Sequence, residues 1–181
     1  MINELFPFQK AAVNDLRTKT AMALNSFRSY KVPQVVSLQA PTGSGKTIIM
    51  AALIEDIFYG NEIYAEQPEA IFVWLSDSPQ LNEQSKQKIE QKADKVRIDQ
   101  CVVIADESFD QEVLDDGHIY FLNTQKLGKG ANLGTHSDTR QYTIWETIEN
   151  TAREKSDRLY FIIDEYGIIG QVKRRPILKA S

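Results

Sequence analysis

The sequence predicts an α/β fold of three layers, in which a mainly parallel sheet lies between helices. Two observations predict it. Short, continuous apolar segments alternate with longer segments of helical periodicity, and a glycine-rich turn joins the first apolar segment to a helix. Strands that alternate with helices favour parallel pairing with helices on both faces of the sheet. The 181 residues suffice for one domain with a proper core.

Four segments read as helices. The first begins near Pro7, because proline suits the first turn of a helix. An apolar stripe at roughly helical spacing supports this helix; it consists of Val13, Leu16, Leu24 and Phe27. The other helices are expected at about residues 46–59, 79–93 and 138–154.

Five segments read as strands, at residues 35–38, 70–76, 101–105, 119–123 and 159–163. The second, fourth and fifth are continuous apolar runs rather than alternating ones. This pattern is typical of strands that are buried on both faces of a parallel sheet. We see no internal repeat and no low-complexity linker before residue 165.

Composition favours a soluble globular protein, with 42% hydrophobic and 25% charged residues. The one cysteine, Cys101, excludes a disulfide framework, and its apolar neighbours predict a buried thiol rather than a reactive one. The N-terminus has no signal-peptide pattern, and no apolar run approaches the ~20 residues that span a bilayer. We therefore expect a cytoplasmic protein without a membrane partner.

The charge is distributed unevenly along the chain. The net charge is −4, but residues 166–181 contain four basic side chains and no acid. The sequence therefore predicts one domain at residues 1–165, with a charge of −8, and a short basic tail at residues 166–181. A net negative charge does not indicate a nucleic-acid binder, yet helix N-termini and local basic groups can still hold phosphates.

The segment APTGSGKT, residues 40–47, follows a strand and opens a helix, which is the context of a phosphate-binding loop. Gly43 and Gly45 let the backbone N–H groups converge on phosphate oxygens, and the helix N-terminus adds partial positive charge. Lys46 would reach the β- and γ-phosphates, and the Thr47 hydroxyl would ligate Mg²⁺. The expected nucleotide-binding residues of the loop are Thr42, Gly43, Ser44, Gly45, Lys46 and Thr47.

An acidic pair follows the last apolar strand. Asp164 ends this strand and is expected to bind Mg²⁺ together with Thr47, while Glu165 is expected to activate the attacking water. Adjacent residues at a strand end diverge, so the two carboxylates can serve two ligands. The alternative is a solvated Asp-Glu turn, which we would favour if the phosphate loop were missing. We assign the catalytic roles to Lys46, Asp164 and Glu165.

These motifs resemble those of superfamily 2 DEAD/DEAH-type helicases and translocases. The segments APTGSGKT and LYFIIDE resemble motifs I and II, and LFPFQ resembles the Q motif. Two further segments, FVWLSDSPQLNEQ and YFLNTQKLGKG, look most like the ATPase part of type III restriction enzyme Res subunits. The resemblance covers residues 4–165 and implies the N-terminal lobe of a RecA-like P-loop NTPase, with ATP and Mg²⁺ as cofactors.

The resemblance also implies contacts to adenine. Gln9 would bind the adenine edge, because an amide can both donate and accept a hydrogen bond. Phe6 stands where the family often has arginine, and it would stack on the base. The alternative for Gln9 is an ordinary residue on the helix surface.

Contacts to the DNA backbone follow from the resemblance in the same way. The expected residues come after two strands: Ser78, Gln80, Thr124 and Gln125. Such contacts position a strand without reading its sequence. The alternatives are a helix N-cap at Ser78 and a turn at Thr124. Lys126 and Lys129 would add attraction to phosphate, or simply lie on a solvated loop.

The sequence departs from the family after the acidic pair, where Tyr166-Gly167 replace the usual Ala-His, Ala-Asp or Cys-His. The resemblance implies a second RecA-like lobe, whose arginine fingers accelerate related reactions by roughly 10³–10⁵. That lobe, or other restriction-modification subunits, would be the protein partners. We therefore expect a fold incomplete at its C-terminus, in a truncated motor lobe that binds ATP weakly and hydrolyses it near background. The alternative is a non-catalytic nucleotide- or DNA-binding regulatory fragment.

Overall fold

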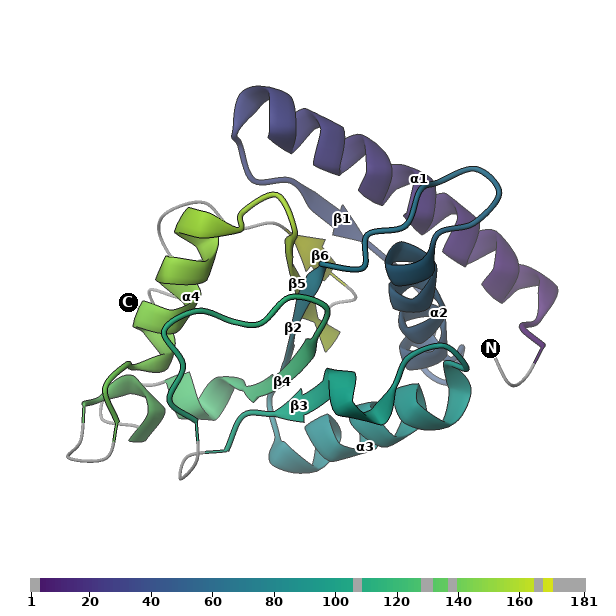
Figure 1. The fold of residues 1–181 in the computed structure, drawn as a ribbon. Coiled ribbons are helices and arrows are strands. Elements are labelled where there is room, and N and C mark those ends of the chain that lie inside the picture. The colour runs from purple at the N-terminus through teal and green to yellow at the C-terminus, as the bar shows by residue number, and fades with distance from the viewer. Residues whose placement is uncertain (1–3, 106–108, 128–131, 137–139, 165–167, 171–181) are drawn as a thin grey trace.

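The computed structural model describes residues 4–105, 109–127, 132–136, 140–164 and 168–170. In this part of the chain, six strands form one sheet in the order β1-β6-β5-β2-β4-β3 (Figure 1). Their bounds are Val35–Ser37 (β1), Ile71–Ser76 (β2), Cys101–Val103 (β3), Ile119–Asn123 (β4), Leu159–Ile163 (β5) and Ile168–Gly170 (β6). All five expected strands are therefore confirmed, with ends that shift by two residues at most.

The strand directions confirm the mainly parallel sheet. β2 pairs in parallel with β4 and with β5, and β3 pairs in parallel with β4. β6 is antiparallel to both of its neighbours, β1 and β5. It follows that β1 runs in the same direction as β5. The carboxyl ends of all strands except β6 thus lie at one edge of the sheet, which we call the carboxyl edge.

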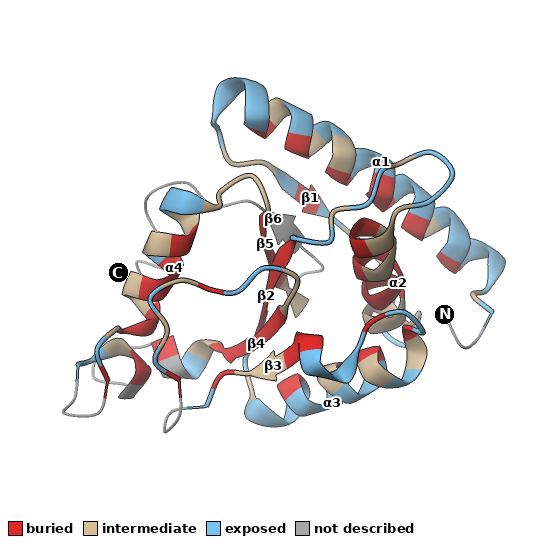
Figure 2. Cartoon of the chain, viewed as in Figure 1, coloured by how far each residue is buried: buried red, intermediate tan, exposed pale blue. Residues whose placement is uncertain are grey.

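Helices cover both faces of this sheet, as the sequence predicts. Their bounds are Pro7–Tyr30 (α1), Lys46–Tyr59 (α2), Pro79–Lys92 (α3) and Ile144–Glu154 (α4), with short 3-10 turns at Ile98–Gln100, Thr124–Leu127 and Asn132–Gly134. One apolar core joins α1, α2 and α3 to the sheet, and a second joins α4 to its other face. Every residue of β2 is buried between these two cores (Figure 2).

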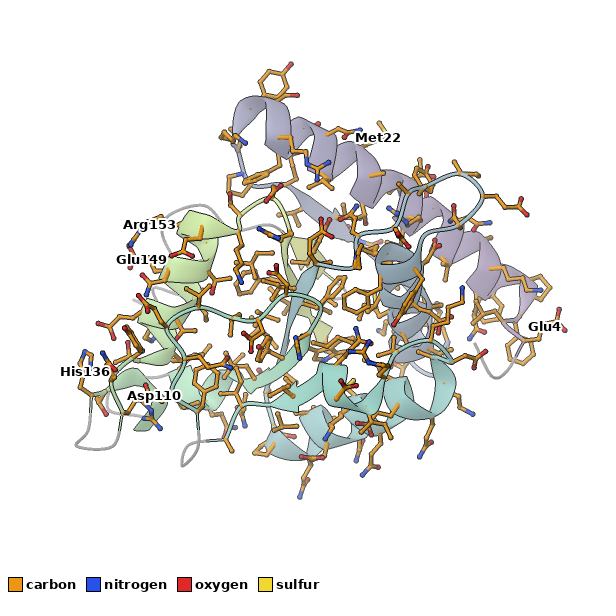
Figure 3. The ribbon with its side chains drawn as sticks, viewed as in Figure 1. Glu4, Met22, Asp110, His136, Glu149 and Arg153 are labelled. Carbon is orange, nitrogen blue, oxygen red and sulfur yellow. The ribbon has the colours of Figure 1, made fainter. Side chains whose placement is uncertain are left out.

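The outer surfaces of the helices expose ion pairs, and α1 also exposes apolar side chains. Glu149 and Arg153 form an ion pair of 3.8 Å on α4, and both side chains point away from the sheet (Figure 3). Met22 projects outward from α1 on the opposite side of the molecule. Within the described ranges, no helix combines the length and the apolar character needed to cross a bilayer.

The start of α4 differs from the prediction. The expected start near Asp138 is wrong, because α4 begins at Ile144. Thr143 and Glu146 form a capping box, in which the Thr143 backbone N–H donates to Glu146 Oε2 at 2.8 Å. The two backbone N–H groups before Thr143 instead donate to Asp110 Oδ1, each at 2.9 Å. These bonds hold the preceding residues in a turn, so the helix cannot begin earlier.

Strand β6 is a feature that the sequence did not predict. It occupies the position between β1 and β5, where Ile168 pairs with Ser37 and with Ile163. Three residues are too short a segment for a reliable periodicity. The strand matters for the site because it connects β1, which leads into the glycine-rich loop, to β5, which leads into Asp164.

Candidate nucleotide-binding site

The glycine-rich loop leaves β1 at the carboxyl edge and enters α2. Thr42 and Gly43 occupy the centre of a turn that the Ser44 backbone N–H closes on Pro41 O at 3.2 Å. Gly43 has φ +82° and Gly45 has φ +83°, in the left-handed region that favours glycine. A Cβ at Gly43 would have no neighbour within 4 Å among the described residues. The sequence therefore places glycine where the backbone requires it.

Within the described part of the chain, the N-terminus of α2 has no side-chain cap. Its N-cap residue, Gly45, has no side chain to accept a hydrogen bond, and the first turn contains no acidic residue. The first bond within the helix runs from Ile49 N to Gly45 O at 2.9 Å, so the N–H groups that precede it have no partner within the helix. These donors and the helix dipole favour an anion at this position.

Two side chains of the loop support the fit to a phosphate group. The Ser44 Oγ is buried and has no hydrogen-bond partner among the described residues. The Lys46 ammonium donates to Ala40 O at 3.1 Å and so lies back across the loop. An ammonium group has three donors, which leaves two for a ligand. Oxygen atoms of a phosphate would satisfy both the hydroxyl and the ammonium group.

Gln9 touches this loop directly. Its side chain is only 6% exposed, Nε2 donates to Ser44 O at 3.0 Å, and Oε1 accepts from the Phe6 backbone N–H at 3.1 Å. Gln9 is therefore no ordinary surface residue. An amide has two donors and two acceptor positions, so one of each remains for an adenine edge.

Phe6 and Phe8 lie beside Gln9 and form an exposed aromatic pair. They are 64% and 55% exposed, and their rings are stacked with centroids 6.0 Å apart and an interplanar angle of 6°. A flat, exposed ring is a suitable surface for a base. The structure thus brings the predicted adenine residues together with the predicted phosphate loop.

A buried ion pair holds α1 against α2 and so keeps Gln9 on the loop. Arg17 is 2% exposed, and its Nε lies 3.6 Å from Asp56 Oδ2 on α2. Burial lowers the pKa of Arg17 and raises the pKa of Asp56, while each charge opposes the shift in its partner. Arg17 also donates to Ala65 O at 3.2 Å, which helps to offset the cost of burying the charge.

Asp164 follows β5 at the same edge as the loop. Its Oδ2 accepts a hydrogen bond of 3.2 Å from the Ser85 hydroxyl of α3. β6 lies between β1 and β5, so the two strands that lead to the loop and to Asp164 are about 10 Å apart, twice the strand spacing. Thr47 is half-buried in the first turn of α2. Glu165 lies outside the described residues.

The predicted DNA-binding residues come together at the ends of two neighbouring strands. β2 leads to Ser78, and the neighbouring β4 leads to Thr124. A hydrogen bond joins the two strand ends, since Asp77 Oδ1 accepts from Thr124 Oγ1 at 3.0 Å. The Ser78 Oγ accepts from Leu81 N at 3.2 Å, which confirms the N-cap that we considered as the alternative. Thr124 begins a 3-10 turn, again as the alternative predicted.

Gln80 and Gln125, the other two predicted DNA-binding residues, are exposed to solvent. The side chain of Lys126 is not described, and Lys129 lies outside the described residues. The carboxylate of Asp77 was not predicted at this position, and it would oppose the approach of a phosphate. The sequence could have indicated it, because Asp77 is an acidic residue between the strand predicted at residues 70–76 and Pro79.

A separate groove of about 420 Å³ lies between α1 and β1. Its lining includes Met22, Ser26 and Val35, and it contains none of the predicted site residues. This groove is therefore not the candidate nucleotide site.

The chain was also compared with known protein families. The family model described as type III restriction enzyme, res subunit, matches residues 2–171. The matched range contains the glycine-rich loop, Gln9 and Asp164. Searches of curated proteins and of solved structures gave no match.

Proposed function

The chain belongs to the type III restriction enzyme Res subunit family, and from this premise we propose that it binds ATP as the N-terminal lobe of a DNA helicase or translocase. A lobe of this family is of the ATPase or helicase type and has a RecA-like P-loop fold. The observation that carries the proposal is the uncapped N-terminus of α2 behind the glycine-rich loop. This is an anion site at which the first turn of α2 supplies no acidic side chain.

In the proposed site the loop binds the triphosphate, and the ammonium group of Lys46 donates its two remaining hydrogen bonds to phosphate oxygens. Thr47 and Asp164 would hold Mg²⁺, which, when bound, neutralises charge on the phosphates. Gln9 would bind the adenine edge and Phe6 would stack on the base. Glu165 would orient the attacking water, a role that follows from the family resemblance.

The proposed DNA contact lies at the ends of β2 and β4. Ser78, Gln80, Thr124 and Gln125 would touch the sugar-phosphate backbone without reading its sequence. The hydrogen bond between Thr124 and Asp77 supports a single surface here, because it joins the ends of the two strands. The partner would be a DNA strand, with a second RecA-like lobe or other restriction-modification subunits as protein partners.

We propose that these 181 residues alone bind ATP weakly and hydrolyse it near background. In related phosphoryl transfers an arginine from a second lobe or partner supplies a rate factor of roughly 10³–10⁵. Measuring ATP hydrolysis with DNA, with and without a separately supplied second lobe, distinguishes a motor lobe from a non-catalytic regulatory fragment. Stimulation by the second lobe supports the motor. Robust DNA-stimulated hydrolysis by this chain alone would contradict its weak activity.

Nucleotide titration tests the proposed site itself. We expect Lys46→Ala to weaken ATP binding by about tenfold or more, because a hydrogen bond to a charged group contributes about 1.5–3 kcal/mol. Lys88→Ala removes an exposed lysine of α3 and serves as the matched control. Thermal unfolding of both variants checks that the fold is intact. Equal affinities of the wild type and of Lys46→Ala would overturn the proposal.

A further inference from the structure

The hydroxyl group of Ser85 contacts a residue far away in the sequence. Ser85 lies on α3 and is only 4% exposed, and its Oγ donates to Asp164 Oδ2 at 3.2 Å. Asp164 follows β5 at the carboxyl edge, the same edge as the loop that leads into α2. The bond therefore joins the helix after β2 to the carboxylate that our proposed function assigns to Mg²⁺.

The buried face of α3 becomes polar toward this edge. Its buried residues are Asn82, Ser85 and Ile89, which lie on one side of the helix by their spacing. Asn82 Oδ1 accepts a hydrogen bond of 2.7 Å from Ser76 Oγ, and Ser76 lies at the end of β2. Burial of a polar group costs free energy unless it is hydrogen-bonded, and both polar residues have a partner. The start of α3 is thus fixed on the sheet, and it holds Ser85 in place.

We propose that Ser85 is a positioning residue for the metal-binding carboxylate of Asp164. The inference rests on the proposed function, since it concerns the same Mg²⁺ site. The Ser85 hydroxyl engages Oδ2 and leaves Oδ1 outside this bond. A carboxylate held at one oxygen by a rigid helix presents the other oxygen in a fixed direction. Without this bond, the Asp164 side chain would lose its rotational freedom only when the metal binds, and this loss of entropy would weaken metal binding.

The bond also explains why a serine lies in a buried position of a helix. An alanine would fit the helix better by intrinsic propensity and would bury no polar group. Hydrogen bonds to an ionised carboxylate are stronger than those between neutral groups, so this one restricts the Asp164 side chain effectively. Loss of such a partner typically weakens metal affinity ~10–100-fold.

The test separates binding of the metal from binding of the nucleotide. The affinity of the full chain for a fluorescent ATP analogue is measured in EDTA and over a series of Mg²⁺ concentrations. For Ser85→Ala we expect unchanged affinity in EDTA and a half-saturating Mg²⁺ concentration raised by about tenfold or more. Ser85→Cys keeps the size of the side chain but has only a weak donor, so an intermediate shift is expected. Gln84→Ala, an exposed position of the same helix, is the matched control.

The outcomes distinguish the inference from the function on which it rests. Asp164→Ala must raise the half-saturating Mg²⁺ concentration if this carboxylate binds the metal. If it does so while both Ser85 variants match the wild type, only the role of Ser85 is overturned. If the wild type shows no Mg²⁺-dependent nucleotide binding, the proposed function and the role of Ser85 both fail. Thermal unfolding of each variant identifies a loss of fold, and Ser85→Cys then replaces Ser85→Ala as the deciding variant.

Discussion

Gly45 lies next to the Gln9 side chain, which reaches from α1 to the glycine-rich loop. A Cβ at this position would lie 2.6 Å from Gln9 Nε2, whereas a Cβ at Gly43 would have nothing within 4 Å. Both glycines have a positive φ, so they share one backbone requirement. They differ in that Gly45 also makes room for the amide group of Gln9. The Gln9 bond to Ser44 O depends on this space.

This difference predicts that alanine substitutions at the two glycines lower the free energy of unfolding by unequal amounts. Gly43→Ala and Gly45→Ala should each lower the free energy of unfolding by about 1 kcal/mol, because a left-handed backbone strains any residue with a Cβ. Gly45→Ala should cost roughly 1 kcal/mol more, since Gln9 must move and its hydrogen bond is lost. Urea unfolding of the two variants measures both values. Equal costs would show that the contact with Gln9 does not constrain the loop.

The loop residues themselves were predictable from the sequence, because spacing alone identifies the turn, the lysine and the helix that follows. The contacts of Ser85 and Gln9 were not predictable in the same way. Each joins residues that lie far apart in the chain, by 79 positions for Ser85 and Asp164. A polar residue on a polar helix gives no sign of burial until the packing of that helix is known. Residue spacing therefore predicted the loop, but it did not predict the contacts that Gln9 and Ser85 make at the site.

At the scale of elements, β6 decides how the site is held together. Within the described residues, β1 is paired to the rest of the sheet through β6, by the pairs Val36–Ile169 and Ser37–Ile168 among others. β6 in turn pairs with β5. The strands that lead to the loop and to Asp164 are thus linked by a three-residue strand. The sequence predicted the long apolar strands from their composition, but three residues carry too little pattern to predict a strand.

Ile169→Pro tests this link, because proline removes a backbone N–H from a strand that is paired on both sides. We expect faster hydrogen exchange at the amides of β1, together with weaker ATP binding, while β2 and β4 remain protected. Ile169→Val keeps the N–H group and is the matched control. Unchanged protection of β1 in the proline variant would show that β6 does not hold β1 in the sheet.

At the scale of the whole molecule, three buried groups at the sheet remain protonated in the fold. Burial raises the pKa of Cys101 to about 12, and it likewise raises the pKa values of Tyr120 and Tyr160 to about 12. Cys101 is buried, as its apolar neighbours predicted. The Tyr120 hydroxyl accepts from the Asp115 backbone N–H at 3.0 Å, and the Tyr160 hydroxyl donates to Gln67 Oε1 at 2.7 Å. Both tyrosines lie in segments that the sequence predicted as buried strands, at residues 119–123 and 159–163.

These shifts predict a loss of stability at alkaline pH. In the unfolded chain the thiol ionises near pH 9 and the phenols near pH 10, whereas in the fold all three remain protonated to about pH 12. Between these values the unfolded state binds fewer protons than the native state, so the free energy of unfolding falls as the pH rises. The slope is up to about 1.4 kcal/mol per pH unit for each group that has ionised only in the unfolded chain. Urea unfolding at pH 8, 9.5 and 10.5 would measure this slope.

Tyr160→Phe should flatten the slope above pH 10, whereas Tyr30→Phe, at an exposed position, should not. If the two variants gave the same slope as the wild type, burial of Tyr160 would not control the alkaline limit of the fold.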